Sequence, residues 1–187
     1  MHERPDGEST TQRYPVLPAM TLKTFCRHLG TALAQVPEAE APARAAALLP
    51  GVLANPALLA VHQRAAPETG YGRHCIFICP QDRFSVLAVV WPAGIGSPVH
   101  DHATWCAFGV YEGALEERRY RPAGGGCAVE CARLVHRPGA VAHLPVDAPD
   151  IHSMHNPATR PVISIHVYGG NSDRLGPNVK TIWPVEG

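Results

Sequence analysis

The chain has 187 residues, enough for one domain with a sizeable core, and 45% of them are hydrophobic. Sixteen Lys and Arg residues balance sixteen Asp and Glu residues, so no excess of basic charge favours binding to nucleic acid or to an anionic membrane. Residues 1–15 are polar and do not resemble a secretory signal, and the longest apolar run, residues 86–91, is too short to span a membrane. We therefore expect a cytoplasmic monomer whose six cysteines are free thiols.

Helical patterns follow a tail of residues 1–18, which we expect to be flexible. Thr21 is a typical N-cap for a helix in which apolar residues recur at helical spacing. The Ala-rich segment 41–49 predicts a second helix, and Asn55 followed by Pro56 predicts the start of a third. The chain is therefore expected to begin with helices.

From Tyr71 onwards, short segments rich in Val, Ile, Phe and Tyr alternate with Gly and Pro. Many short strands with turn signals between them are typical of an antiparallel β-barrel or jelly roll. We therefore predict a single, mainly β domain over residues 19–187. In it, a layer of about three α-helices over residues 19–66 packs against a barrel over residues 71–187. A barrel of this size has room for a ligand in its interior or mouth.

The most informative motif is G-x5-H-x-H-x3-C-x6-G, formed by Gly94, His100, His102, Cys106 and Gly113. Side chains alternate along a strand, so the two histidines lie on the same face. Neutral imidazole is a good ligand for divalent iron, zinc, copper or nickel. The motif therefore predicts a metal site.

A third ligand is needed, and the best candidate is His152, which lies on a later predicted strand. His136 and His143 lie near predicted turns, and His155 should point away from the face of His152, so these three are weaker candidates. The predicted metal ligands are His100, His102 and His152.

The motif resembles the first motif of the cupin superfamily, which usually has a metal-binding Glu at the position of Cys106. Gly139 and Pro145, followed by His152 and Asn156, resemble the second cupin motif, although this His arrives two residues late. A cupin with three histidines and Cys in place of Glu resembles the cysteine dioxygenase type I family of thiol dioxygenases. The resemblance covers about residues 71–168 and includes the bacterial 3-mercaptopropionate dioxygenase branch.

This resemblance implies a cupin barrel in which the three histidines bind ferrous iron (Fe2+). It also implies that both atoms of O2 are added to the sulfur of a small thiol, which gives a sulfinate. The residues agree with this chemistry: three neutral imidazoles leave the metal its full charge and an open face, which suits an anionic thiolate.

Ser164, His166 and Tyr168 lie two residues apart, so they share one face of a predicted strand. The family's Ser-His-Tyr relay has this spacing, which implies that Tyr168 points at the iron and that His166 orients it. Mammalian-type members also form a thioether between the relay Tyr and a Cys near the H-x-H motif, whereas the bacterial mercaptopropionate branch usually has Gly there. Cys106 is therefore either crosslinked to Tyr168 or a small buried thiol.

A carboxylate-bearing substrate needs a cation, and the segment GYGRH resembles the one in which the cysteine branch places an Arg. Arg73 takes this position if the loop at residues 81–83 has one extra residue, and His74 takes it otherwise. Arg73 is preferred because its guanidinium can hold a carboxylate by two parallel hydrogen bonds. Arg174 is a second candidate cation. The substrate remains open between L-cysteine, 3-mercaptopropionate and mercaptosuccinate.

Two other functions would suit a cupin. One is a non-redox isomerase or decarboxylase that uses zinc or manganese, but such an enzyme would normally keep the carboxylate ligand that Cys106 replaces. The other is a non-catalytic ligand-binding cupin, which would not need the row of Ser164, His166 and Tyr168. A ferrous thiol dioxygenase is therefore the preferred interpretation.

Overall fold

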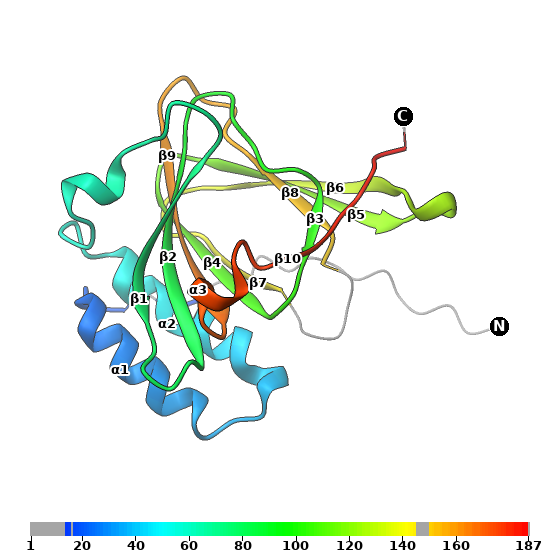
Figure 1. Cartoon of the computed structure of the whole chain (residues 1–187). Coiled ribbons are helices and arrows are strands. Elements are labelled where there is room, and N and C mark those ends of the chain that lie inside the picture. The colour runs from blue at the N-terminus through cyan, green and yellow to red at the C-terminus, as the bar shows by residue number, and fades with distance from the viewer. Residues whose placement is uncertain (1–13, 16, 145–149, 187) are drawn as a thin grey trace.

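The computed structural model describes residues 14–15, 17–144 and 150–186. The described chain folds into two antiparallel five-stranded sheets (Figure 1). In spatial order, the first sheet consists of β1 (Gly72–Ile78), β2 (Phe84–Trp91), β9 (Val162–Gly169), β4 (Cys106–Glu112) and β7 (Val141–Leu144). The second consists of β10 (Val179–Ile182), β3 (His100–His102), β8 (His152–His155), β5 (Leu115–Pro122) and β6 (Ala128–His136). The prediction of a mainly β jelly roll is confirmed.

The first sheet is buried on both faces, which explains the continuous apolar sequence of β2. Phe84 and Val86 pack outwards against the helices, whereas Leu87 and Val89 pack into the space between the sheets. The inner cluster also includes Leu115 of β5 and residues of β7 and β8. The two sheets therefore enclose a shared interior.

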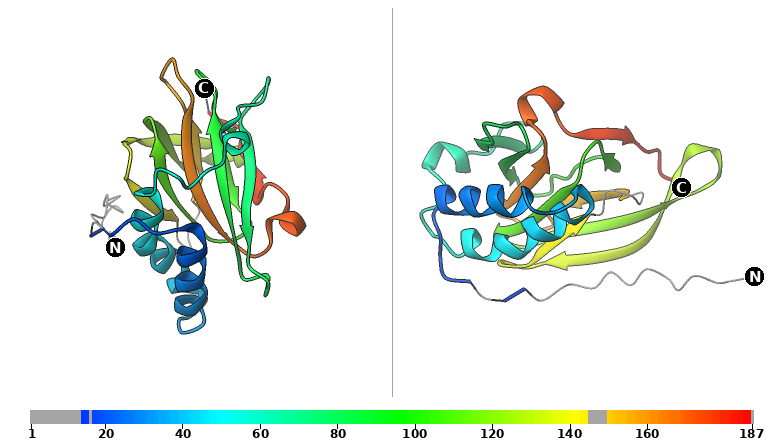
Figure 2. Two further views of the ribbon diagram at one scale, coloured as in Figure 1. Left: turned by 90° about the vertical axis from the view of Figure 1, so that its left-hand side faces the viewer. Right: turned by 90° about the horizontal axis from the view of Figure 1, so that it is seen from below.

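An N-terminal helical layer covers the outer face of the first sheet (Figure 2). It consists of α1 (Leu22–Leu33), α2 (Ala41–Leu53) and the 3-10 helices Glu38–Glu40 and Val61–Arg64. The Thr21 hydroxyl accepts a hydrogen bond from the Thr24 amide at 3.2 Å, so the predicted N-cap is confirmed. Within residues 17–144 and 150–186, no helix is long and apolar enough to cross a membrane.

Several details differ from the sequence predictions. Asn55 does not open a third α-helix: its side chain accepts from the Ala57 amide at 2.9 Å, as an N-cap would, but residues 56–59 form turns instead of a helix. The strand β10 has no counterpart in the prediction, and a short helix, α3 (Ser172–Leu175), precedes it. Most of the predicted tail lies outside the described residues, as does Pro145 of the second motif.

A bulge between Cys75 and Phe77 changes the faces of β1. Before the bulge, Arg73 pairs with Val89 and Cys75 pairs with Leu87, both of which belong to the inner cluster. After it, Phe77 packs with the helical layer, and so does Cys79 just beyond the strand. Cys79 is buried, whereas Cys75 is exposed.

Candidate metal centre

The three predicted ligands meet between β3 and β8. His100 and His102 occupy the two ends of β3, and His152 begins β8 directly opposite His100. One ring nitrogen from each residue lies within 4.8 Å of the other two. All three side chains are shielded from solvent, so the group can surround a single metal ion.

Hydrogen bonds orient all three rings. Each Nδ1 donates to an oxygen: that of His100 to the Pro98 carbonyl at 2.9 Å, that of His102 to Asp150 at 2.7 Å, and that of His152 to Glu117 at 3.0 Å. Because the proton stays on Nδ1, the lone pair of each ring is on Nε2 and is available to a metal. Asp150 and Glu117 thus form carboxylate–histidine pairs behind two of the rings.

Two of the rings, those of His100 and His102, are also held in the neutral form that binds metals. Burial, together with the neighbouring His152 and His102, lowers the pKa of His100 to about 3. Burial likewise lowers the pKa of His102, and this effect outweighs the opposing hydrogen bond to Asp150. A metal ion would not have to displace a proton from either ring at neutral pH.

Glu117 is fully buried and connects His152 to a wider polar cluster. Its second oxygen accepts from His136 at 2.8 Å and from Arg119 at 3.2 Å. Burial alone would raise the pKa of this carboxyl group, but the hydrogen bonds from His136 and His152 outweigh it and lower the pKa of Glu117. Glu117 is therefore ionised, which strengthens its hold on the His152 ring.

Sequence reasoning missed both carboxylates, although a weak signal was present. Glu117 lies two residues after the buried Leu115, and Asp150 lies two residues before His152. The period of a strand places residues two apart on one face, so each acid could have been assigned to the interior.

The predicted relay is continuous. The Tyr168 hydroxyl lies 3.1 Å from Nδ1 of His166, and Nε2 of His166 lies 2.8 Å from the Ser164 hydroxyl. The indole N–H of Trp91 donates to the same Ser164 oxygen at 2.9 Å. Because an indole can only donate, Ser164 accepts from Trp91 and keeps its own proton for a second bond. In the tautomer in which Ser164 donates to Nε2 of His166, Nδ1 donates to the Tyr168 oxygen and the phenol proton is available to a ligand.

Burial sets the protonation of the relay. It lowers the pKa of His166 well below its usual value and raises that of Tyr168 well above its usual value. The imidazole is therefore neutral and the phenol is protonated at neutral pH. The ring centroids of Tyr168 and His102 are 5.8 Å apart, so the relay ends beside the three-histidine group.

Cys106 adjoins the relay rather than the three-histidine group. It lies directly opposite Tyr168 in the pairing of β4 with β9, and its Sγ is 4.0 Å from Nδ1 of His166. Burial raises the pKa of this thiol well above its usual value. The group of metal-binding atoms found within the described residues consists of the three histidines alone, without Cys106.

Arg73 reaches the same space from β1. Its Cζ lies 5.9 Å from the centre of the Tyr168 ring, and one terminal nitrogen donates to the Gly176 carbonyl at 3.4 Å. The other terminal nitrogen is buried and has no hydrogen-bond partner among the described residues. His74, the alternative at this position, bonds the Ala65 carbonyl at 3.0 Å instead. Arg73 is therefore the cation that faces Tyr168.

Arg174 lies elsewhere. Its side chain is 75% exposed and pairs with Asp82 at 2.6 Å, on the surface near the turn between β1 and β2. The structure thus does not bring this second candidate cation to the three histidines.

Residues 68–175, more than half of the chain, match the sequence model of the family described as "Cysteine dioxygenase type I". The chain belongs to this family. Membership in the cysteine dioxygenase type I family supports a thiol dioxygenase activity in general, and the three-histidine group fits the metal site of such an enzyme.

Solved structures similar to this family member include three proteins of low sequence identity. One is a cupin domain of an XRE-family transcriptional regulator from Enterobacter cloacae, with 17% identity and a TM-score of 0.40, covering 54% of this chain and 96% of that one. Another is a protein with a double-stranded β-helix domain from Klebsiella pneumoniae. It has 17% identity and a TM-score of 0.45, and the match covers 61% of this chain and 90% of that one. A third is an RmlC-like cupin from Desulfovibrio desulfuricans. It has 19% identity and a TM-score of 0.43, and the match covers 63% of this chain and 94% of that one. Likeness at this level says nothing about activity.

The carboxylate behind His152 leads to a prediction about metal affinity. Glu117→Gln keeps the shape of the side chain but removes its charge, so the His152 ring loses its strongest acceptor. We expect binding of Zn2+ or Co2+ to weaken about 10- to 100-fold. Equilibrium titration against a competing chelator measures this change.

Glu116→Gln is the matched control, because Glu116 is the next residue and pairs with Arg118 at 2.7 Å rather than with a histidine. Its affinity for the metal should equal that of the unaltered protein. Equal affinities for both variants would show that Glu117 does not support the metal site.

Proposed function

We propose that this family member is a ferrous-iron thiol dioxygenase, with His100, His102 and His152 as the iron ligands. It adds both atoms of O2 to the sulfur of a small mercaptocarboxylate and releases the sulfinate. The observation that carries this proposal is the convergence of three imidazoles, without a carboxylate among them, beside the end of the relay. Iron bound there would supply a redox-active centre with positions for a thiolate and for dioxygen.

Arg73 is proposed to anchor the substrate. Its buried terminal nitrogen lacks a partner among the described residues, and such a group is costly unless a ligand satisfies it. A carboxylate beside the Tyr168 ring would accept from this nitrogen and fix the distance from the anchor to the sulfur. The substrate candidates remain L-cysteine, 3-mercaptopropionate and mercaptosuccinate, all of which carry a carboxylate and a thiol.

The relay is proposed to hold a proton at the Tyr168 hydroxyl. Trp91 and Ser164 fix His166 so that its Nδ1 donates to the phenol oxygen. The phenol proton can then form a hydrogen bond to oxygen at the reacting sulfur. Because the whole row is buried, water does not compete for this proton.

The two alternative functions have less support. A zinc or manganese isomerase would normally use a carboxylate as a ligand, but Glu117 and Asp150 bind the outer nitrogens of the histidines. A non-catalytic ligand-binding protein would have no need for the buried relay. Its polar groups would then be desolvated on folding without serving a function.

Oxygen consumption tests the proposal directly. The metal-free protein is loaded anaerobically with Fe2+ and then mixed with air-saturated buffer and each of the three candidate thiols. We expect thiol-dependent oxygen uptake with one O2 consumed per sulfinate formed, and the panel ranks the substrates by kcat/KM. Absence of uptake with every thiol, together with zinc bound in the protein as isolated, would contradict the proposal.

Replacement of Arg73, the proposed substrate anchor, tests its role in substrate binding. Arg73→Gln should raise KM for thiols that bear a carboxylate by about tenfold or more, because a charge-assisted pair is replaced by a neutral hydrogen bond. Arg174→Gln is the control, since this exposed side chain is paired with Asp82. Steady-state kinetics that are the same for both variants would show that Arg73 does not hold the substrate.

The pairing of Cys106 with Tyr168 makes a thioether between them a further proposal. Formation of the bond joins Sγ to a ring carbon and removes two hydrogen atoms, with O2 as the oxidant. Peptide mapping by mass spectrometry after turnover should find the two peptides linked, and Cys106→Ser should abolish the linked species. Finding both residues unmodified after turnover would rule the crosslink out.

A further inference from the structure

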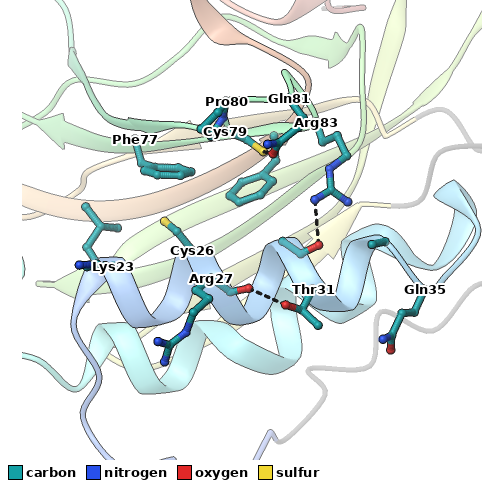
Figure 3. A pocket seen from close by; sticks show the side chains of 14 residues that line it. Lys23, Cys26, Arg27, Thr31, Gln35, Phe77, Cys79, Pro80, Gln81 and Arg83 are labelled. Carbon is teal, nitrogen blue, oxygen red and sulfur yellow. Dashed lines mark hydrogen bonds between the residues drawn. The ribbon is translucent and has the colours of Figure 1, made fainter.

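A groove lies on the side of the first sheet that faces away from the three histidines. It has a volume of about 780 Å³ and is formed by α1 and by the turn from β1 to β2 (Figure 3). Its walls are largely apolar and include Leu22 and Cys26 of α1, Phe77 of β1 and Phe84 of β2. Phe77 and Phe84 belong to the outer cluster with the helices, so the sheet separates the groove from the metal centre.

Three cations line the groove, and no Asp or Glu does so among the described residues. Lys23 and Arg27 lie one turn apart on α1, and neither forms an ion pair with any described residue. Arg83 comes from the opposite wall. The acid next to it in the sequence, Asp82, pairs with Arg174 instead. The groove therefore combines apolar walls with an excess of positive charge.

Arg83 is held in place at the groove. One terminal nitrogen donates to the Gly30 carbonyl at 3.0 Å, a bond that Figure 3 shows reaching across to α1. This carbonyl lies in the last turn of the helix, where a cation is favoured. The contact leaves the other N–H groups of the guanidinium available for a ligand.

Gly30 forms part of the groove wall and leaves it without a side chain at this point. Glycine within a helix is less stable than alanine, and Gly30 has no positive φ that would require it. A Cβ added there would lie 3.7 Å from Arg83 and 4.0 Å from Phe84, which are ordinary contacts. Neither the backbone nor the packing demands glycine, but a large side chain at this position would project into the groove.

We propose that this groove binds a small anionic amphiphile, such as a medium-chain aliphatic carboxylate. The apolar chain lies against Phe77 and Phe84, and the carboxylate is held by Arg83, which Figure 3 shows above the C-terminal half of α1. The volume is within the range of small-molecule sites, and an arginine fork matches the geometry of a carboxylate. This site involves none of the metal-facing histidines and does not depend on the proposed dioxygenase activity.

Isothermal titration of the full-length protein with decanoate, below its micellar concentration and without added metal, tests the proposal. We expect saturable binding of one decanoate per chain. Gly30→Phe should weaken it at least about tenfold because the ring occupies the groove, whereas Gly30→Ala should leave it unchanged. The variant Arg83→Gln removes the guanidinium that holds the carboxylate and should weaken binding about tenfold. Circular dichroism establishes that each variant is folded.

Several outcomes would overturn the proposal: no saturable binding, equal affinity in the folded Gly30→Phe and Gly30→Ala variants, or equal affinity for decanoate and decyltrimethylammonium. Binding to anionic phosphatidylglycerol vesicles but not to monomeric decanoate would mean that the face contacts membranes instead. If Gly30→Phe does not fold, Arg83→Gln decides, and unchanged decanoate affinity in that variant would also overturn the proposal.

Discussion

The hydrogen bond between Glu117 and His152 is the contact on which the site most depends. A fully buried carboxylate is stable only where donors surround it, and His152, His136 and Arg119 all donate to Glu117. The bond decides which nitrogen of His152 carries the proton, and the free nitrogen is thereby left facing His100 and His102. Without it, the third histidine would have no fixed tautomer or orientation.

Asp150 accepts a hydrogen bond from His102, as Glu117 does from His152. Two carboxylates therefore lie directly behind the three-histidine group, which itself contains no acidic residue. The carboxylate that a typical cupin metal site places among its ligands is thus absent from the group, while negative charge remains one hydrogen bond further out. The inner positions stay open to ligands from solution. The charge behind them still favours a cation at the centre, because Coulomb attraction in a buried site falls off slowly with distance.

The sequence allowed the inner site to be predicted because its members follow the period of a strand. His100 and His102 are two residues apart, as are Ser164, His166 and Tyr168, and such pairs share a face wherever the strand lies. The supporting contacts were harder to predict because they join distant segments: Glu117 and His152 are separated by 35 positions. Arg73 was preferred to His74 on the chemistry of its side chain alone, because the strand pairing that places each of them cannot be read from the sequence. The expected third helix was wrong: Asn55 makes the hydrogen bond of an N-cap, but turns follow it.

The bulge in β1 has a consequence for how the family member can vary. One extra residue lets a single strand supply Arg73 to the interior and Phe77 to the outer layer. A regular strand would place Arg73 and Phe77, four residues apart, on the same face. Deleting Ile76 would leave both side chains on their present faces, because Cys75 opposite Leu87 and Phe77 opposite Val86 would become consecutive pairs of a regular ladder. Ile76 is therefore a residue that β1 can lose without exchanging its interior and exterior side chains.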